Sequence, residues 1–301
     1  MRRTRIAALA VSAALMVGLS GCGGDDSSGD AGDGAREKGE RRETAQRSTN
    51  AVTALKAVSR STRNEDSARV EGTQSQTLPG GTESHVTTKG AMDWSEGGIT
   101  GNLDVTQSGG AVQGSPIDGK ALPARYTPDA MYLNMGDDFA REAGGGAHWI
   151  KYDYDVLAKK AGASGSFVKD QLQNNNPSRS VELLLAAGKV RKVGEESVRG
   201  TPTTHYSGTV DIAELAKLQS TNLSEQELES LRTQLRQTGL TSQRIDLWVD
   251  GDDLLVKKRE SGKSEQGDSS FDSTVHYSDY GTSVKVSEPS SSDTVDFEKI
   301  G

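Results

Sequence analysis

The sequence predicts an α+β fold in which amphipathic helices cover one face of an antiparallel sheet. Apolar and polar residues alternate from Ile99 to Thr106, a period of two that is typical of a strand with one buried face. The Asp250-Gly251 dipeptide stands between two apolar runs, IDLWV and LLVKK, and predicts a tight hairpin. Residues 224–239 repeat leucine at helical spacing. Strands joined by hairpins pair antiparallel, and such helices can cover the apolar face of their sheet.

A secretory signal occupies residues 1–21. Three arginines precede an apolar run from Ile6 to Leu19, which is shorter than the roughly 20 residues that span a bilayer. The Leu19-Ser20-Gly21-Cys22 sequence that follows resembles the lipobox of bacterial lipoproteins. This resemblance implies cleavage between Gly21 and Cys22 and a diacylglyceryl group on Cys22, with acyl chains such as palmitate. Because two acyl chains hold a protein stably at a bilayer, we expect an anchored, extracytoplasmic chain on the outer face of the cytoplasmic membrane.

The composition excludes several classes of protein. Of 301 residues, 33% are hydrophobic and 5% aromatic, which is too polar for a multi-span membrane protein. Cys22 is the only cysteine, so a disulfide framework and a zinc ribbon are excluded. Loss of residues 1–21 removes three arginines and changes the formal net charge from −8 to −11. An acidic chain without a basic cluster is repelled by nucleic acid, and we expect no nucleic-acid partner.

Two further segments follow the signal. Residues 22–43 begin with a Gly/Ser/Asp run and continue with mixed charge, so they predict a flexible linker behind the lipidated cysteine. Residues 44–301 contain no internal repeat and no second linker of this kind, and they predict a single domain.

The first element expected in this domain is a helix over about 44–60, where Ala51, Leu55 and Val58 recur at helical spacing. Strand-like alternation follows the stretch at Ile99 in three later places. These places are 245–249, 275–277 and 284–286.

Three further helices have marked beginnings. Asn176 before Pro177 places a capping residue and a first-turn proline ahead of Val181, Leu184 and Leu185, with Gly188 expected to end that helix. Asp211 with Glu214 opens a second helix. Ser224 to Glu227 forms a capping box for a third, which runs to Gly239.

Six segments in order now suggest a family. They are 129–135 (DAMYLNM), 148–151 (HWIK), 193–200 (VGEESVRG), 204–211 (THYSGTVD), 246–251 (DLWVDG) and 277–281 (YSDYG). Together with the lipobox they resemble the actinobacterial LppX/LprG-type lipoproteins. The resemblance implies a LolA-like fold, a curved and unclosed antiparallel half-barrel with helices across its concave face. It also implies a carrier that takes the acyl chains of a lipid or glycolipid into an apolar cavity, with an envelope transporter as a further candidate partner.

The expected cavity lining consists of apolar residues of the short helices and of the central strands. The candidates are Met131, Leu133, Trp149, Val181, Leu184, Leu185, Leu215 and Leu218. Ordinary packing of helices on the sheet is the alternative role for each of them. Thr, Ser, Gln and Gly at many positions of 70–77 and 86–89 favour a small cavity.

The sequence offers no cofactor and no catalytic residues. The four histidines lack metal-binding spacing, and the aspartates at 250–253 lack the ligand order of a calcium loop. The chain also has no GxSxG elbow and no phosphate-binding loop. Two functions therefore remain, a lipid-binding lipoprotein and a non-enzymatic envelope sensor or protein-interaction module on the same fold with a closed cavity.

Overall fold

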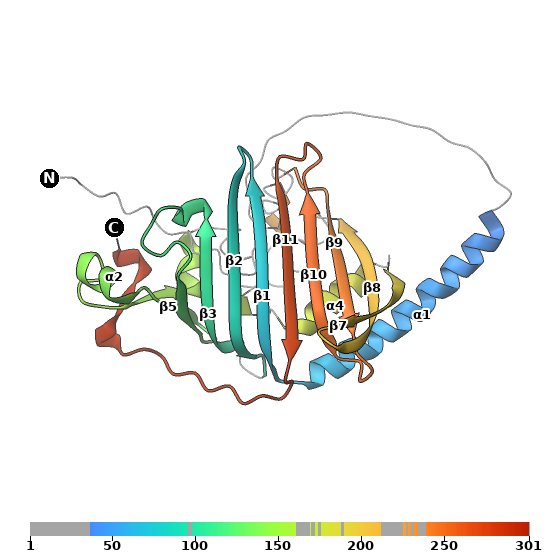
Figure 1. The fold of residues 1–301 in the computed structure, drawn as a ribbon, viewed down its shortest axis with the longest axis horizontal. Coiled ribbons are helices and arrows are strands. Elements are labelled where there is room, and N and C mark those ends of the chain that lie inside the picture. Colours follow the sequence, from blue (N-terminus) through green and yellow to red (C-terminus); the bar gives the residue numbers. More distant parts are fainter. Residues whose placement is uncertain are drawn as a thin grey trace.

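The molecule is built on one sheet of twelve strands (Figure 1). The computed structural model describes residues 37–95, 98–160, 169, 172–173, 176–187, 190–211, 225–226, 228–229, 232–233 and 239–300, with side chains from residue 50 onward. The strands are β1 (Ser67–Leu78), β2 (Thr82–Asp93), β3 (Thr100–Gly109), β4 (Ala121–Tyr126), β5 (Ala130–Asn134), β6 (Trp149–Asp153), β7 (Val190–Val198), β8 (Thr201–Asp211), β9 (Ser242–Val249), β10 (Leu255–Lys263), β11 (Ser270–Ser278) and β12 (Thr294–Asp296).

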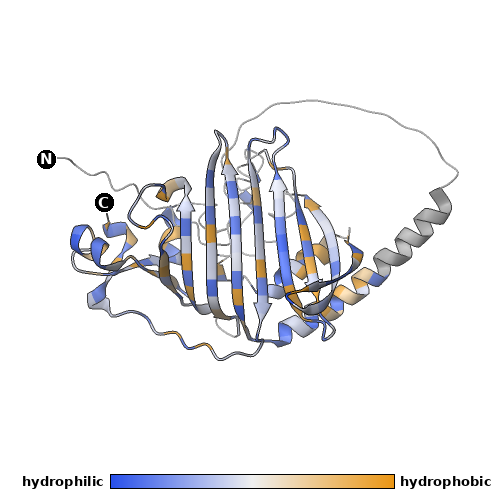
Figure 2. Cartoon of the chain, viewed as in Figure 1, coloured by the Kyte–Doolittle hydropathy of each residue, from blue (hydrophilic) through white to orange (hydrophobic). Residues whose placement is uncertain are grey.

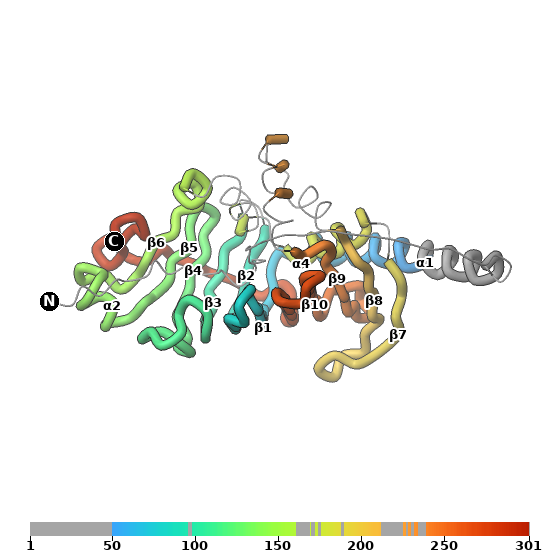
Figure 3. Tube along the Cα trace, turned by 90° about the horizontal axis from the view of Figure 1, so that it is seen from above, coloured from blue at the N-terminus to red at the C-terminus, as the bar shows by residue number. Residues whose placement is uncertain are grey.

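The sheet is unclosed. Its strand order is β12-β6-β5-β4-β3-β2-β1-β11-β10-β9-β8-β7, and the two outermost strands do not pair with each other. All neighbours are antiparallel except β12, which runs parallel to β6. Seen from above, the sheet is a single curved layer with helices on one side (Figure 3). The predicted fold class, a curved and unclosed antiparallel sheet with helices on one face, is confirmed.

Two helices cover the sheet at its β7 end. Helix α1 (Glu37–Asn64) packs against β7 and against α4 (Pro177–Ala186), and α4 contacts β8, β9 and β10. The face that α4 covers is called the inner face below. As predicted, Asn176 caps α4: its side-chain oxygen accepts the backbone N–H of Arg179 at 3.0 Å, and Pro177 takes the first helical position. A third helix, α2 (Gly136–Glu142), follows β5.

The alternation of apolar and polar residues decides which side chains point inward. Figure 2 shows bands of opposite hydropathy along β1, β2, β3 and β11. In β3, Leu103 and Val105 are buried on the inner face, whereas Asn102 and Asp104 are exposed. The half-buried strand predicted around Ile99 is therefore confirmed.

The structure corrects the predicted start of the domain. Helix α1 begins at Glu37, seven residues before the predicted boundary at Thr44, so residues 37–43 belong to the helix and not to the 22–43 linker. This segment, EKGERRE, consists mainly of Glu, Lys and Arg, which have high helix propensity. Low apolar content predicted a linker here, whereas the helix that starts at Glu37 includes these residues.

Two further expectations need correction. Residues 284–286 form no strand and belong to an extended segment that lies on the other face of the sheet. The β9–β10 hairpin exists, but its connection spans residues 250–254 and is not a two-residue turn. The Asp250 carboxylate accepts the backbone N–H groups of Asp252 and Leu254 at 3.0 and 2.9 Å, which stabilises the longer loop. Asp253, with φ of 60°, adopts the left-handed conformation there.

The two other predicted helices, from Asp211 and from Ser224 to Gly239, lie largely outside the described residues. Asp211 itself is the last residue of β8. Gly188, the expected end of α4, is also outside the described residues.

Leu55 of α1 provides a test of the helix packing. Its side chain is fully buried, so Leu55→Ala removes apolar contacts and leaves a cavity. We expect a loss of about 2–5 kcal/mol in the free energy of unfolding, measured by denaturant titration. Lys56→Ala, an exposed change on the same helix, is the control and is expected to stay within about 0.5 kcal/mol of the parent. Equal midpoints for the two variants would contradict the observed orientation of α1.

Candidate functional site

The inner face of strands β1–β6 carries a continuous set of apolar side chains, called the apolar inner face below. It consists of Val70, Val86, Met92, Leu103, Val105, Leu122, Ala124, Tyr126, Met131, Leu133, Ile150 and Tyr152. The main contacts of α1 with the sheet are with β7, and those of α4 are with β8, β9 and β10. The apolar inner face is therefore the part of the sheet best suited to apolar groups other than those two helices.

Strand register brings these residues together from six strands. Leu103 pairs with Ala124, Ala124 with Leu133, and Leu133 with Ile150, so four strands contribute one row across the sheet. Gly90 lies beside Leu103 in β2. A Cβ at Gly90 would lie 2.9 Å from the Leu103 side chain, so glycine allows Leu103 to lean over the neighbouring strand.

This surface also carries polar atoms, among them the Gln74 and Thr88 side chains, which share the face of Val86 and Gly72, and buried tyrosine hydroxyls. Burial raises the pKa of Tyr126 and of Tyr152 to about 12. Burial also raises the pKa of Tyr154, just after β6. These phenols stay neutral at physiological pH, so the surface carries no charge from them.

A buried polar group of side chains lies where α4 packs on β10. Lys258 of β10 is 4% exposed, and its Nζ donates to Ser180 Oγ of α4 at 3.1 Å. The Ser180 hydroxyl in turn donates to Glu260 Oε1 at 2.9 Å, and Lys258 Nζ lies 3.8 Å from the same carboxylate. A buried ion pair costs desolvation energy, and the Ser180 hydrogen bonds help to offset that cost. This contact fixes α4 on β10.

The predicted cavity residues fall into four groups, the last of which is Trp149. Met131 and Leu133 lie on the apolar inner face. Val181 and Leu184 are fully buried in α4, and Leu185 is partly buried there; because α4 packs on β8–β10, these three serve helix packing. Leu215 and Leu218 lie outside the described residues.

Trp149 lies on the opposite face of the sheet, which contradicts its place in the predicted lining. It pairs with Asn134 and packs with Ala130 and Tyr132 in a separate small cluster. The Arg125 guanidinium stands 4.6 Å from the centre of its ring. A strand alternates its side chains, so Ile150 and not Trp149 faces inward with Leu133.

Sequence reasoning also missed part of the apolar inner face, chiefly Tyr126 and Tyr152. Strand β4 contains Pro123, which weakened its strand signal, although Leu122, Ala124 and Tyr126 do alternate. In β6 the alternation of Ile150 and Tyr152 spans only five residues. If these short runs had been interpreted as strands with alternating faces, both tyrosines would have been predicted to lie on the buried face.

The outer face of the sheet is polar and heavily paired. Arg244 donates to both carboxylate oxygens of Asp246 at 2.7 and 2.9 Å, and Asp246 also contacts His205 Nε2 at 2.8 Å. His205 stacks on Trp248 with ring centres 4.3 Å apart. Burial alone would raise the pKa of Asp246, but its hydrogen bonds to Arg244 and His205 lower it below the usual range.

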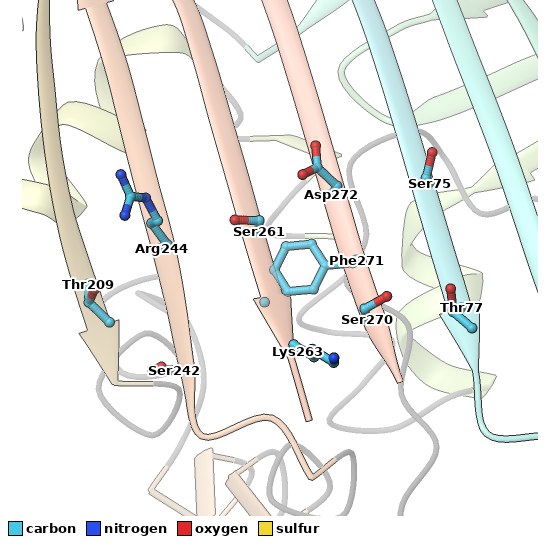
Figure 4. Close-up of a pocket in the computed structure, with 11 residues that line it drawn as sticks. Ser75, Thr77, Thr209, Ser242, Arg244, Ser261, Lys263, Ser270, Phe271 and Asp272 are labelled. Carbon is cyan, nitrogen blue, oxygen red and sulfur yellow. The ribbon is translucent and has the colours of Figure 1, made fainter. Parts of the chain in front are cut away.

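An open groove of about 520 Å³ lies on this outer face near the ends of β1 and β8–β11 (Figure 4). It is lined by Ser75, Thr77, Thr209, Ser242, Arg244, Ser261, Gly262, Lys263, Ser270, Phe271 and Asp272. Phe271 stands over Gly262, where a Cβ would lie 2.5 Å from its ring, so the aromatic side chain fills the space left by the glycine. Hydroxyls and charges dominate the rest of the groove, which makes it unsuitable for an acyl chain.

Within the ranges that the structure describes, no three His, Cys, Asp or Glu side chains form a group that could hold a metal ion. No helix in this part of the chain is both long and apolar enough to cross a membrane.

Comparison with known proteins gives two relatives. A Streptomyces coelicolor protein named "Putative lipoprotein SCO4650" is 38% identical over 99% of this chain and 96% of its own length. An uncharacterized 31.2 kDa protein of Streptomyces griseus, from the rplA-rplJ intergenic region, is 47% identical over 83% of this chain and 80% of its own length.

No family model matches the chain. Among solved structures, the Mycobacterium tuberculosis lipoprotein LppX is similar over 79% of this chain and 99% of its own, with 14% identity and a TM-score of 0.47. At that identity and TM-score the likeness bears on neither ligand nor partner. The identity and coverage of the Streptomyces relatives do establish kinship, and the chain belongs to the same protein family as the Streptomyces coelicolor and Streptomyces griseus proteins.

Proposed function

We propose that this protein is a membrane-anchored envelope lipoprotein that binds the acyl chains of a lipid or glycolipid against its apolar inner face and carries that lipid in the envelope. The observation that carries the proposal is the set of apolar side chains across the inner face of β1–β6, whereas the main sheet contacts of α1 and α4 are with β7–β10. Each CH₂ group of a buried acyl chain contributes about 0.8 kcal/mol, so such a surface needs no charged group to bind lipid.

The anchoring part of the proposal rests on the lipobox and on the relatives. Cys22 follows Leu19-Ser20-Gly21, and the Streptomyces coelicolor relative, which matches 99% of the chain, carries the name of a lipoprotein. A diacylglyceryl group on Cys22 would hold the domain at the outer face of the cytoplasmic membrane. The carrier would then act within reach of that membrane, with an envelope transporter as a candidate partner.

A second function has one specific observation in its favour. The side chains of the apolar inner face are already buried, as Leu133 at 2% and Ile150 at 3% exposure show. A surface packed in this way fits an envelope sensor or protein-interaction module whose cavity is filled by its own side chains. The two functions differ in whether lipid can enter between these residues.

The deciding experiment is native mass spectrometry with organic extraction. The Cys22→Ala chain, purified without detergent from a Streptomyces host, is expected to carry one diacyl or glycolipid molecule. A bare protein mass that stays unchanged after incubation with envelope lipids would instead support the interaction module.

A substitution on the apolar inner face tests the site itself. Leu122 of β4 faces inward and is only partly buried, so Leu122→Gln adds a polar group to the surface at small cost to the fold. We expect lipid affinity to fall about five- to thirtyfold, which corresponds to about 1–2 kcal/mol of lost acyl contact. Ala121→Gln is the matched control, because its neighbouring position is exposed on the outer face. Equal affinities for both variants would place the lipid elsewhere.

The anchor is tested by Cys22→Ala. The substitution removes the acylated thiol, so we expect the protein to leave the membrane fraction and appear in the soluble extracellular fraction. Immunoblotting of fractionated cells measures this change. Ser20→Ala, which keeps the cysteine and a small residue in front of it, is the control and should remain in the membrane fraction; retention of the Cys22→Ala chain would show an anchor other than Cys22.

A further inference from the structure

The C-terminal segment, residues 282–300 and called the strap below, leaves the centre of the sheet and runs back along it to its β6 end (Figure 1). Its backbone carbonyls at Lys285 and Ser287 accept hydrogen bonds from Asn102 and Arg125, both at 2.9 Å, on the outer face. Glu288 then hydrogen-bonds the Tyr132 side chain. No residue of the strap is fully buried. These contacts are few and open to solvent, so the strap is held weakly along most of its length.

At the edge of the sheet the strap turns onto the inner face. Three residues form β12 beside β6, from Thr294 opposite Trp149 to Asp296 opposite Lys151. The next turn places Phe297 on Tyr152, with the rings 5.5 Å apart and 13° from parallel. Val295, Phe297 and Ile300 pack against the main core. The chain end therefore covers the β6 end of the apolar inner face.

One histidine fastens this turn. Nδ1 of His148, just before β6, lies 2.5 Å from Asp293 Oδ1, and the backbone N–H of His148 donates to the same oxygen at 2.9 Å. On its other side, His148 Nε2 lies 3.3 Å from Asp137 of α2. These two carboxylates are the charged groups that act on the imidazole. A protonated His148 can bind both at once, whereas a neutral imidazole donates only one hydrogen bond.

We propose that residues 294–300 are a gate for lipid at the β6 end of the apolar inner face, and that His148 is its latch. The proposal rests on the lipid-binding function proposed above. Opening requires that residues 294–300 release the three residues of β12, the Phe297 ring and the contacts of Lys160 with Phe297 and Glu298, and it uncovers Tyr152 and the inner face behind it. The interior of the sheet stays paired throughout.

The direction of the pH effect follows from the latch. The hydrogen bond between His148 and Asp293 raises the pKa of His148 above the usual 6.5, and the nearby Asp137 carboxylate raises it further. The stabilisation is therefore fully present below the ordinary histidine pKa and is lost as pH rises through the raised value. The same contact lowers the pKa of Asp293, so at the acid end the latch weakens only as pH falls through that lowered value. The contact between His148 and Asp293 is therefore strongest at pH values between these two pKa values, and it weakens as pH rises through the pKa of His148.

Hydrogen exchange tests the latch without any lipid. In the full chain, we expect protection of amides in 147–154 and 290–300, corrected for intrinsic exchange, to fall about two- to fivefold between pH 6 and pH 8.5, the range for a partly exposed ion pair. His148→Gln should abolish this pH dependence. His85→Gln, an exposed histidine on β2 far from the strap, is the matched control and should preserve it. The same pH dependence in all three proteins would overturn the latch.

Lipid uptake tests the gate. Phosphatidylglycerol vesicles that contain a pyrene-labelled phospholipid serve as donors for the full chain, the Phe297→Ala variant and the Lys285→Ala control. We expect Phe297→Ala to take up probe at least threefold faster with the same final amount, and Lys285→Ala to match the parent, because Lys285 is an exposed strap residue outside the gate. Uptake at equal rates would overturn the gate and leave the lipid proposal standing. Absence of uptake by all three proteins would overturn the lipid proposal and the gate together.

Discussion

The pairing of β1 with β11 is the constraint on which the rest of the structure depends. It joins β1–β6, which follow one another in sequence, to β7–β11, through an antiparallel register from Arg69 opposite Ser278 to Thr77 opposite Ser270. About 200 residues separate the two strands, so this pairing closes a long loop and is among the least local contacts in the chain. Without it the apolar inner face would have no neighbour on the β1 side, and α1 and α4 would cover a separate small sheet.

The two halves joined in this way use the same inner face differently. Beside β7–β10 that face is covered by α1 and α4, and the buried contact of Lys258 with Ser180 and Glu260 fixes the position of α4. Beside β1–β6 the same face is largely apolar, and the main sheet contacts of these helices lie elsewhere, on β7–β10. Charged side chains collect on the outer face, where Arg244, Asp246 and His205 satisfy one another. Apart from Lys258 and Glu260, which bond to Ser180 of α4, these charged groups lie on the face opposite the apolar core.

Local patterns in the sequence predicted those elements whose residues lie close together in the chain. The alternation at Leu103 and Val105 identified β3, and the Asn176-Pro177 pair identified the start of α4. The face on which a strand residue lies, and the residue with which it pairs, depend on the strand register, which a local pattern does not contain. Trp149 was therefore placed on the wrong face. The strap shows the same limit: its residues at 284–286 alternate like a strand, but their hydrogen bonds go to side chains of β3 and β4 and not to a neighbouring strand.

Helix α1 and the proposed gate lie at opposite ends of the strand order. The chain enters the domain through α1, which packs at the β7 end, whereas the strap ends at β6 and β12 at the other end of the strand order (Figure 1). A tether that precedes α1 therefore does not have to contact β6, His148 or Phe297. Attachment to the membrane and opening of the apolar inner face can then occur independently, since the contacts that would change in each are carried by different elements. In the proposed carrier, the gate at the β6 end can therefore open without any change in the contacts of α1 with β7 and α4.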